Sequence, residues 1–196
     1  MKVGILRYNA GNTASVRFAL ERLGVNAEVT DDPAKLAALD KVIIPGVGEA
    51  ASAMKYLRER RLDVVIRSLG QPVLGICLGM QILCEFSEEN DTECLGIVPG
   101  RVRRFASAGD LKIPHIGWNT IEPRSDSRLF AGIAPETHFY FVHGFYVERT
   151  DHESAVCRYG KPFAAAFERE NYYGVQFHPE RSASAGEKVL RNFLSL

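Results

Sequence analysis

The sequence predicts an α/β fold with a mostly parallel central sheet, flanked by helices and extended by antiparallel β structure. In the first half, short apolar runs alternate with helical patterns, which is typical of βαβ units. In the second half, short strand-like runs follow one another with turns between them, as in antiparallel sheets. No linker or internal repeat divides the 196 residues, so we expect one domain, 1–196.

Helix boundary signals separate the elements of the first half. Asn12 precedes a helical pattern as an N-cap, and Asp32 is a cap followed by Pro33 at the first helical position. Gly24 and Gly70 end helical patterns. The expected strands are residues 2–8, 25–29, 41–44 and 73–76, and the expected helices include 13–23, 34–39, 50–57 and 62–69.

The second half changes to short strands. The apolar positions of residues 80–86 first predict a helix directly after the strand at 73–76. The expected strands then cover residues 95–105, 113–121, 139–147, 154–159, 163–167 and 173–177, and a final helix covers 186–196.

Cys77 is the first candidate catalytic residue. It follows the apolar strand Val73 to Ile76, lies between Gly75 and Gly79, and precedes the expected helix. Strand, tight turn and helix are the layout of a nucleophile elbow, in which the turn exposes the nucleophile at the end of the sheet. A helix N-terminus also favours a thiolate over a thiol. The alternative is that Cys77 is a small apolar core residue, as free cysteines often are.

His178 and Glu180 are candidates for the base and the residue that orients it. A strand-like run ends at His178, because Pro179 cannot donate to a sheet ladder. Glu180 is two residues further on, within reach of one ring nitrogen, which leaves the other nitrogen for a nucleophile. The alternative for this segment is a His-Pro turn with a solvated glutamate.

The segment Pro45 to Gly48 is either a simple turn or an oxyanion loop. It follows an expected strand, so it lies at the same edge of the sheet as Cys77, where parallel sheets bind substrates. An N–H group near Val47 or Gly48, with that of Leu78, would then face a developing oxyanion. Glycines make alternative peptide orientations accessible in such a loop.

The two motifs Gly-Ile-Cys-Leu-Gly-Met-Gln (75–81) and Gln-Phe-His-Pro-Glu (176–180) together resemble the class I, triad-type glutamine amidotransferases. Within that family the chain is most similar to glutaminase subunits of imidazole glycerol phosphate synthase. The narrower likeness depends on four segments: residues 8–12, 45–48, 114–119 and 140–143. Two residues depart from the subfamily pattern, Gly144 where a serine is common and Arg181 where a lysine is common.

The resemblance implies a flavodoxin-like fold, L-glutamine as substrate and no cofactor or metal. Cys77, His178 and Glu180 would form the triad, with oxyanion donors near Val47, Gly48 and Leu78. The same likeness implies substrate contacts at Gly46, Gln81 and Glu89, and contacts with a partner at Asn12 and Arg181. That partner would be a (β/α)₈ cyclase subunit that uses the ammonia to make imidazole glycerol phosphate and an aminoimidazole carboxamide nucleotide in histidine biosynthesis.

Composition argues against several other classes of protein. Lys+Arg and Asp+Glu both number 24, so no basic excess suggests binding to nucleic acid or to an anionic membrane. No apolar run approaches the ~20 residues of a membrane span, and the N-terminus reads as a strand rather than a signal peptide. The four cysteines form no zinc pattern. We therefore expect free thiols and a cytoplasmic location.

Three other functions remain open from the sequence. One is a glutaminase of the same fold that serves another acceptor, for example in a sugar-amidating pathway. Another is a non-catalytic interaction subunit, against which the intact Cys77, His178 and Glu180 argue. The third is a cysteine peptidase or thioesterase on a similar elbow.

Overall fold

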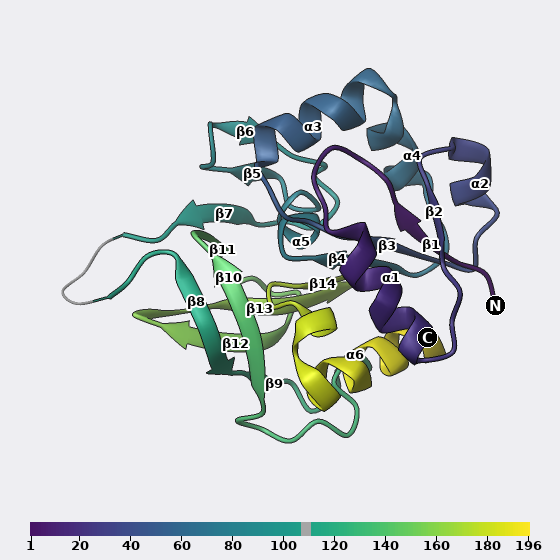
Figure 1. The fold of residues 1–196 in the computed structure, drawn as a ribbon. Helices are drawn as coiled ribbons and strands as arrows, with labels where there is room; N and C mark the ends of the chain where they lie inside the picture. Colours follow the sequence, from purple (N-terminus) through teal and green to yellow (C-terminus); the bar gives the residue numbers. More distant parts are fainter. Residues whose placement is uncertain (107–110) are drawn as a thin grey trace.

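The computed structural model describes residues 1–106 and 111–196, and its central sheet confirms the predicted fold class (Figure 1). The parallel part of the sheet has the order β2-β1-β3-β4-β14. Its strands are β1 (Val3–Leu6), β2 (Glu28–Thr30), β3 (Lys41–Ile44), β4 (Val73–Ile76) and β14 (Tyr172–Val175). Because β14 pairs in parallel with β4, the segments that follow these two strands meet at one edge of the sheet.

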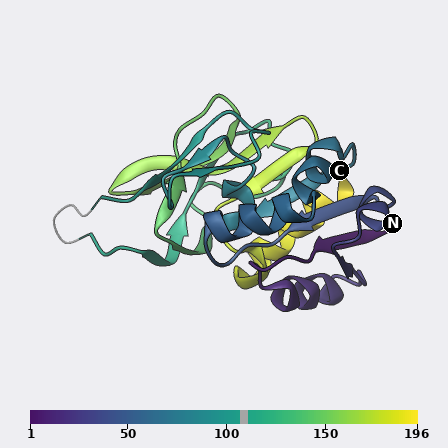
Figure 2. The same ribbon diagram turned by 90° about the horizontal axis from the view of Figure 1, so that it is seen from above.

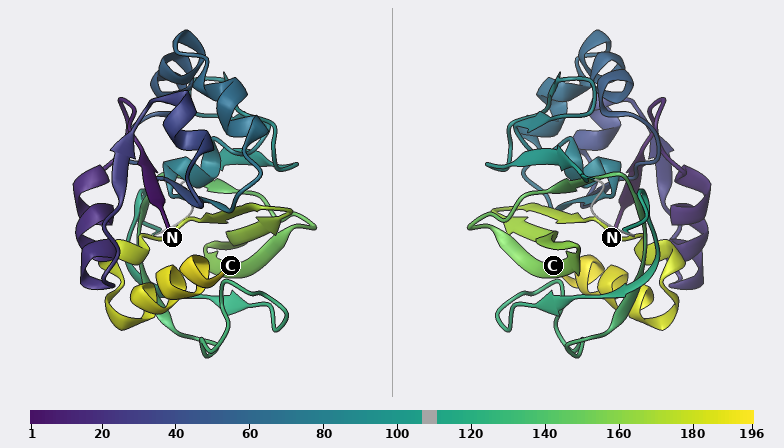
Figure 3. Two further views of the ribbon diagram at one scale, coloured as in Figure 1. Left: turned by 90° about the vertical axis from the view of Figure 1, so that its right-hand side faces the viewer. Right: turned by 90° about the vertical axis from the view of Figure 1, so that its left-hand side faces the viewer.

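Helices cover both faces of this parallel sheet (Figure 3). Apolar side chains of α1 (Thr13–Arg22) and α6 (Ala183–Ser195) pack into the core on one face. The other face is covered by α2 (Pro33–Ala37), α3 (Ala50–Glu59) and α4 (Leu62–Ser68). Asn12 caps α1 and Asp32 caps α2, with Pro33 in the first turn, as the sequence predicts.

The antiparallel extension continues the sheet beyond β14 and lies on the side away from both termini (Figure 2). The order continues through β13 (Lys161–Arg169), β11 (Phe145–Val147), β7 (Arg101–Arg104), β5 (Phe86–Ser87) and β6 (Thr92–Glu93). A branch leaves the sheet at β13, which also pairs with β12 (Glu153–Tyr159), and β12 in turn pairs with β9 (Glu122–Pro123). A separate antiparallel pair consists of β8 (His115–Thr120) and β10 (His138–His143).

The helix expected after the elbow is much shorter than the sequence predicts. α5 covers only Leu78–Gln81, and Phe86 already belongs to β5. A longer helix would need the carbonyl groups of residues 82–84 for its own N–H donors. Those carbonyls instead accept hydrogen bonds from residues 95–98, which fold back onto them. The expected strand at 95–105 is reduced to β7 for the same reason.

The expected strand at 139–147 is in fact two strands in different sheets. β10 pairs with β8, β11 pairs with β13 and β7, and Gly144 lies between them. The change of sheet brings Val142 to Phe145 past the end of β4, next to Cys77. The segment that joins β10 to β11 therefore forms one wall of the site described below.

Candidate active site

Cys77 lies on a strained turn between β4 and α5. Its backbone dihedrals are φ 53° and ψ −110°, a conformation that costs a residue with a side chain on the order of 1–3 kcal/mol. The turn needs glycine at position 79, where a Cβ atom would lie 1.9 Å from the carbonyl oxygen of Ile44. At Gly75 a Cβ atom would lie 2.5 Å from the carbonyl oxygen of Gly79. These close approaches hold the cysteine at the carboxyl end of the parallel sheet, as a nucleophile elbow requires.

His178 and Glu180 are held together beside the elbow. His178 Nδ1 is 2.8 Å from Glu180 Oε1, and both side chains are only 3% exposed. The His178 N–H donates to the carbonyl oxygen of Tyr140, and the Ser182 hydroxyl donates to the His178 carbonyl oxygen. Glu180 lies on the single turn η1 (Pro179–Arg181). The imidazole is therefore fixed at its backbone and at one ring nitrogen.

The free nitrogen of His178 is available to the cysteine. Nε2 is buried and has no hydrogen-bond partner among the described residues. Burial lowers the pKa of His178, but the nearby Cys77 sulfur and the hydrogen-bonded Glu180 carboxylate outweigh burial and raise the pKa to about 10. A raised imidazole pKa beside a cysteine favours the pair of thiolate and imidazolium.

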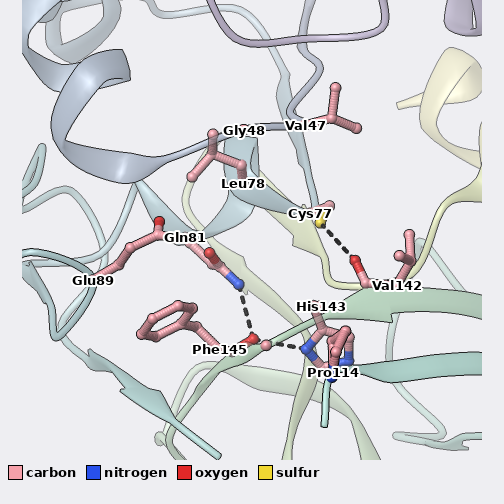
Figure 4. Close-up of a pocket in the computed structure, with 11 residues that line it drawn as sticks. Val47, Gly48, Cys77, Leu78, Gln81, Glu89, Pro114, Val142, His143 and Phe145 are labelled. Atoms are coloured by element: carbon pink, nitrogen blue, oxygen red, sulfur yellow. Dashed lines mark hydrogen bonds between the residues drawn. The ribbon is translucent and has the colours of Figure 1, made fainter.

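A cavity of about 310 Å³ opens in front of Cys77 (Figure 4). Pro114 and the segment from Val142 to Phe145 form the wall that comes from the second half of the chain. The predicted site residues in its lining are Val47, Gly48, Cys77, Leu78, Gln81 and Glu89. This volume is at the small end of the range for ligand pockets, which suits a single amino acid.

Val47 and Gly48, the end of the segment Pro45 to Gly48, form the opposite wall of the cavity. Gly48 has φ +130°, a conformation that favours glycine, and no hydrogen bond from the N–H of Val47 or Gly48 occurs among the described residues. Leu78 is the first residue of α5, so its N–H also lacks a partner within the helix. Three N–H groups that could meet an oxyanion thus lie beside Cys77.

The loop after β1 packs directly on this glycine segment. The buried Tyr8 hydroxyl donates to the Pro45 carbonyl oxygen over 2.5 Å. A Cβ atom at Gly48 would lie 3.3 Å from Ala10 Cβ, and Asn9 Nδ2 donates to the Ser52 carbonyl oxygen at the start of α3. Tyr8 was not predicted as a site residue from the sequence, because its contact with Pro45 depends on how β1 and β3 lie side by side.

Of the residues expected to contact the substrate, two line the cavity, Gln81 and Glu89, and Gly46 does not. The Gln81 amide donates to Phe145 O (3.0 Å) and to the Gln176 side chain (2.9 Å). Glu89 Oε2 accepts a hydrogen bond from the Ala50 N–H at the start of α3, and burial raises its pKa. Gly46 packs against the backbone of the elbow, where a Cβ atom would lie 2.3 Å from the Gly79 nitrogen, and it is not in the cavity lining.

The two residues expected to contact a partner lie outside the cavity. Asn12 caps α1, where its Oδ1 accepts a hydrogen bond from the Ser15 N–H. The Arg181 guanidinium lies 5.8 Å from the centroid of the Tyr140 ring, and both line a shallow hollow with Trp118. Trp118 is 53% exposed, so an aromatic and basic surface adjoins the site.

Three residues near the cavity were not singled out as functional from the sequence. Gln176 is fully buried, and its Nε2 donates to the Cys77 sulfur over 3.6 Å. Gln176 could have been predicted from the sequence, because residues two apart in an extended segment, such as 176 and 178, point to the same side. His143 and His115 are a buried pair whose nitrogens lie 3.0 Å apart, and burial lowers their pKa values to about 3 and about 4. Both are therefore neutral at pH 7.

The described residues offer little for a metal ion or a membrane. Within residues 1–106 and 111–196, no group of three or more His, Cys, Asp or Glu side chains is placed to hold a metal ion. Across the same ranges, no helix combines the length and apolar character that a membrane span needs.

Known proteins similar to this chain share its full length. A family model described as glutamine amidotransferase class-I matches residues 6–196. The chain is 51% identical over 197 residues to the imidazole glycerol phosphate synthase subunit HisH of Bacteroides fragilis, with 100% of both chains covered. It is 48% identical over 200 residues to the subunit of the same name from Vibrio cholerae, covering 99% of this chain and 98% of that one.

Solved structures share the fold at lower sequence identity. One is a glutamine amidotransferase with a TM-score of 0.76 at 22% identity, covering 100% of this chain and 98% of that chain. PurLQS from Thermotoga maritima has a TM-score of 0.71 at 22% identity, covering 99% of this chain and 97% of that chain. With a family model that spans nearly all of its residues, this chain belongs to the class-I glutamine amidotransferases.

Proposed function

We propose that this chain is the glutaminase subunit of an imidazole glycerol phosphate synthase, and that it supplies ammonia to a cyclase subunit in histidine biosynthesis. The observation that carries the proposal is the grouping of Cys77, His178 and Glu180 at the ends of two adjacent parallel strands, in front of a small cavity. Relatives named as the HisH subunit of that synthase match the whole chain at 51% and 48% identity.

The proposed reaction is hydrolysis of the side-chain amide of L-glutamine. The Cys77 thiolate attacks the amide carbon, and His178 protonates the departing ammonia through Nε2. Glu180 keeps the imidazole in place through Nδ1 and stabilises its charged form. Water then attacks the thioester and gives one proton to His178, and the C–S bond breaks. This step releases glutamate, whose new carboxyl group loses its proton to solvent, and restores the thiolate and the imidazolium.

The walls of the cavity fit the remaining groups of the substrate. We assign the N–H groups of Val47, Gly48 and Leu78, which line the cavity and have no hydrogen-bond partner among the described residues, as donors to the oxyanion that forms from the amide oxygen. Each such donor is worth ~10²–10³ in rate. Glu89 offers a carboxylate in the cavity for the substrate ammonium group. Gln81 lines the same cavity, although both of its N–H groups already donate to the protein.

The proposed partner is a (β/α)₈ cyclase that docks over the carboxyl edge of the sheet. Ammonia that escaped into water would be protonated, so the product must pass directly to a bound partner. Trp118 and Arg181 provide an exposed aromatic and basic surface beside the triad, and Asn12 lies on the loop that packs on the glycine segment. The mechanism needs a reduced Cys77, which agrees with a cytoplasmic location.

The test is a glutaminase assay on three samples: the isolated chain, its complex with a co-purified cyclase, and that complex with the acceptor ligand. We expect slow release of glutamate from the isolated chain and release that is faster by orders of magnitude in the third sample. Formation of imidazole glycerol phosphate would distinguish this function from a glutaminase that serves another acceptor. Absence of glutamine hydrolysis in all three samples would refute the proposal.

A further inference from the structure

A continuous line of buried hydrogen bonds ends at the sulfur of Cys77. It begins at the Phe145 carbonyl oxygen, passes through the Gln81 amide (3.0 Å) and the Gln176 amide (2.9 Å), and reaches Cys77 Sγ (3.6 Å). Gln81 is 4% exposed and Gln176 is fully buried, so the bond between the two amides is shielded from water. We propose that Gln176 is a further catalytic residue, which holds the Cys77 thiolate with an N–H donor whose direction Gln81 and Phe145 dictate.

The direction of the line follows from the carbonyl at its start. The Phe145 oxygen can only accept, so the amide atom of Gln81 that faces it must be the nitrogen. The second N–H of that nitrogen points to Gln176, whose facing atom must therefore be the oxygen. The Gln176 nitrogen is then left for the sulfur. An amide flip at Gln81 would place two acceptors against each other, and a flip at Gln176 would place two donors against each other; a buried site tolerates neither.

A second donor fixes the carbonyl from the other side. His143 Nδ1 lies 2.7 Å from Phe145 O, which makes it the protonated nitrogen. His143 Nε2 then accepts from His115 Nδ1 over 3.0 Å, and Asn119 Nδ2 lies 3.3 Å from the remaining nitrogen of His115. The Phe145 carbonyl is thereby held between Gln81 and His143, so its orientation does not depend on substrate. Gln81 and His143 are positioning residues in this arrangement.

The sulfur of Cys77 has a second neighbour, a carbonyl oxygen, which explains why the thiolate needs the donor of Gln176. The Cys77 thiol lies 3.9 Å from the Val142 carbonyl oxygen, which can accept from a thiol but repels a thiolate. Once the proton leaves, only a donor still stabilises the sulfur, and a hydrogen bond to the charged form favours that form. Gln176, which is fully buried and does not line the cavity, provides this donor.

The test measures the reactivity of Cys77 toward iodoacetamide, followed by mass spectrometry as a function of pH. Gln176→Glu keeps an oxygen for Gln81 but places a carboxylate against the sulfur, so we expect alkylation at pH 7 to slow by about tenfold and the midpoint of its pH profile to rise. Gln176→Leu removes the donor without adding charge and should produce a smaller change in the same direction. The other titratable groups beside the sulfur or in its cavity are unchanged in both variants, namely His178, Glu180, Tyr8, His143 and Glu89.

The matched control is Asn192→Asp, because Asn192 is a buried amide on α6 that donates to two backbone carbonyl oxygens far from the elbow. It should lower stability and leave the alkylation profile unchanged. In the unaltered chain, the side-chain N–H signals of Gln176 should shift in nitrogen-edited NMR spectra at the pH where Cys77 ionises. Wild-type alkylation in both folded Gln176 variants, or Gln176 signals that do not follow Cys77, would overturn the inference.

The catalytic role of Gln176 rests on the proposed function, but its effect on the Cys77 thiolate does not. Alkylation of Cys77 needs neither glutamine nor a partner, so the two can fail separately. A shifted alkylation profile without glutaminase activity would keep the role of Gln176 and refute the function. Normal alkylation in an active glutaminase would do the reverse.

Discussion

Substitution of Gly48 by alanine should suppress catalysis without touching the triad. Gly48 has φ +130°, where a residue with a Cβ atom is strained by about 1–3 kcal/mol. Its Cβ atom would also lie 3.3 Å from Ala10 Cβ, on the loop that packs against it. The segment can relieve both by turning its peptides, which removes an N–H donor from the oxyanion. One lost donor costs ~2.7–4 kcal/mol, so we expect kcat to fall ~10²–10³-fold.

Two glycine controls separate this effect from loss of stability. Gly24→Ala shares the strain, with φ +79°, but has nothing within 4 Å of its Cβ position and lies at the end of α1. Gly70→Ala is the second control, because residue 70 has no positive φ and its Cβ atom would contact nothing within 4 Å. The assay is glutamine hydrolysis by the complex with its cyclase and acceptor ligand, with iodoacetamide labelling of Cys77 as the measure of an intact nucleophile. A Gly48→Ala complex with kcat within threefold of the wild-type value would refute the reasoning.

Further predictions concern the triad and the buried histidines. Cys77→Ser should abolish glutaminase activity in a folded chain, and an electrophilic glutamine analogue should add to Cys77 when the labelled peptides are mapped. His178→Ala should be nearly as damaging as Cys77→Ser, whereas Glu180→Gln should be milder, and full turnover by His178→Ala would contradict the triad. Free His143 and His115 titrate near 6.5, and burial lowers their folded pKa values to about 3 and about 4, so stability is full above pH 6.5 and is lost as pH falls. His178, whose pKa is raised to about 10, has the opposite effect: its contribution to stability is present at low pH and is lost as pH rises. We expect a net loss on the order of 3 kcal/mol in unfolding free energy between pH 7 and pH 5, and urea titrations with no such loss would contradict it.

The fold could be predicted where local signals and tertiary pairing agree. The Asp32-Pro33 cap and the apolar run Val73 to Ile76 each specify their element from a few neighbouring residues, and both lie where the sequence predicts. The helix after the elbow was predicted wrongly because residues 82–84 use their carbonyls for distant partners, 95–98. The spacing of apolar residues indicates which side chains are buried but not the backbone conformation. Ile82 and Leu83 are buried, as that spacing indicates, but they are not part of a helix. The extent of the domain, 1–196, stays a prediction.

The site could be predicted where chemistry requires a rare residue pattern. Cys77 between two glycines and His178 before Pro179 stand out in the sequence, and parallel pairing of β4 with β14 brings them to one edge. Tyr8 and His143 did not stand out, because a tyrosine or a histidine in an apolar stretch is usually a core residue. Their contacts, with the Pro45 and Phe145 carbonyls, are set by strand order and by the change of sheet at Gly144.

The two halves of the catalytic apparatus differ in how firmly the fold holds them. His178 is fixed through its N–H, its carbonyl and Nδ1, and Cys77 is fixed by backbone contacts that leave no space for a Cβ atom at Gly79. These groups can be prearranged because they are buried. The donors of Val47 and Gly48 must instead face an open cavity, and no hydrogen bond from either N–H holds the segment among the described residues. We therefore predict that a partner that presses on the loop after β1 changes the oxyanion donors while the triad stays as it is, so that the glycine segment controls the rate.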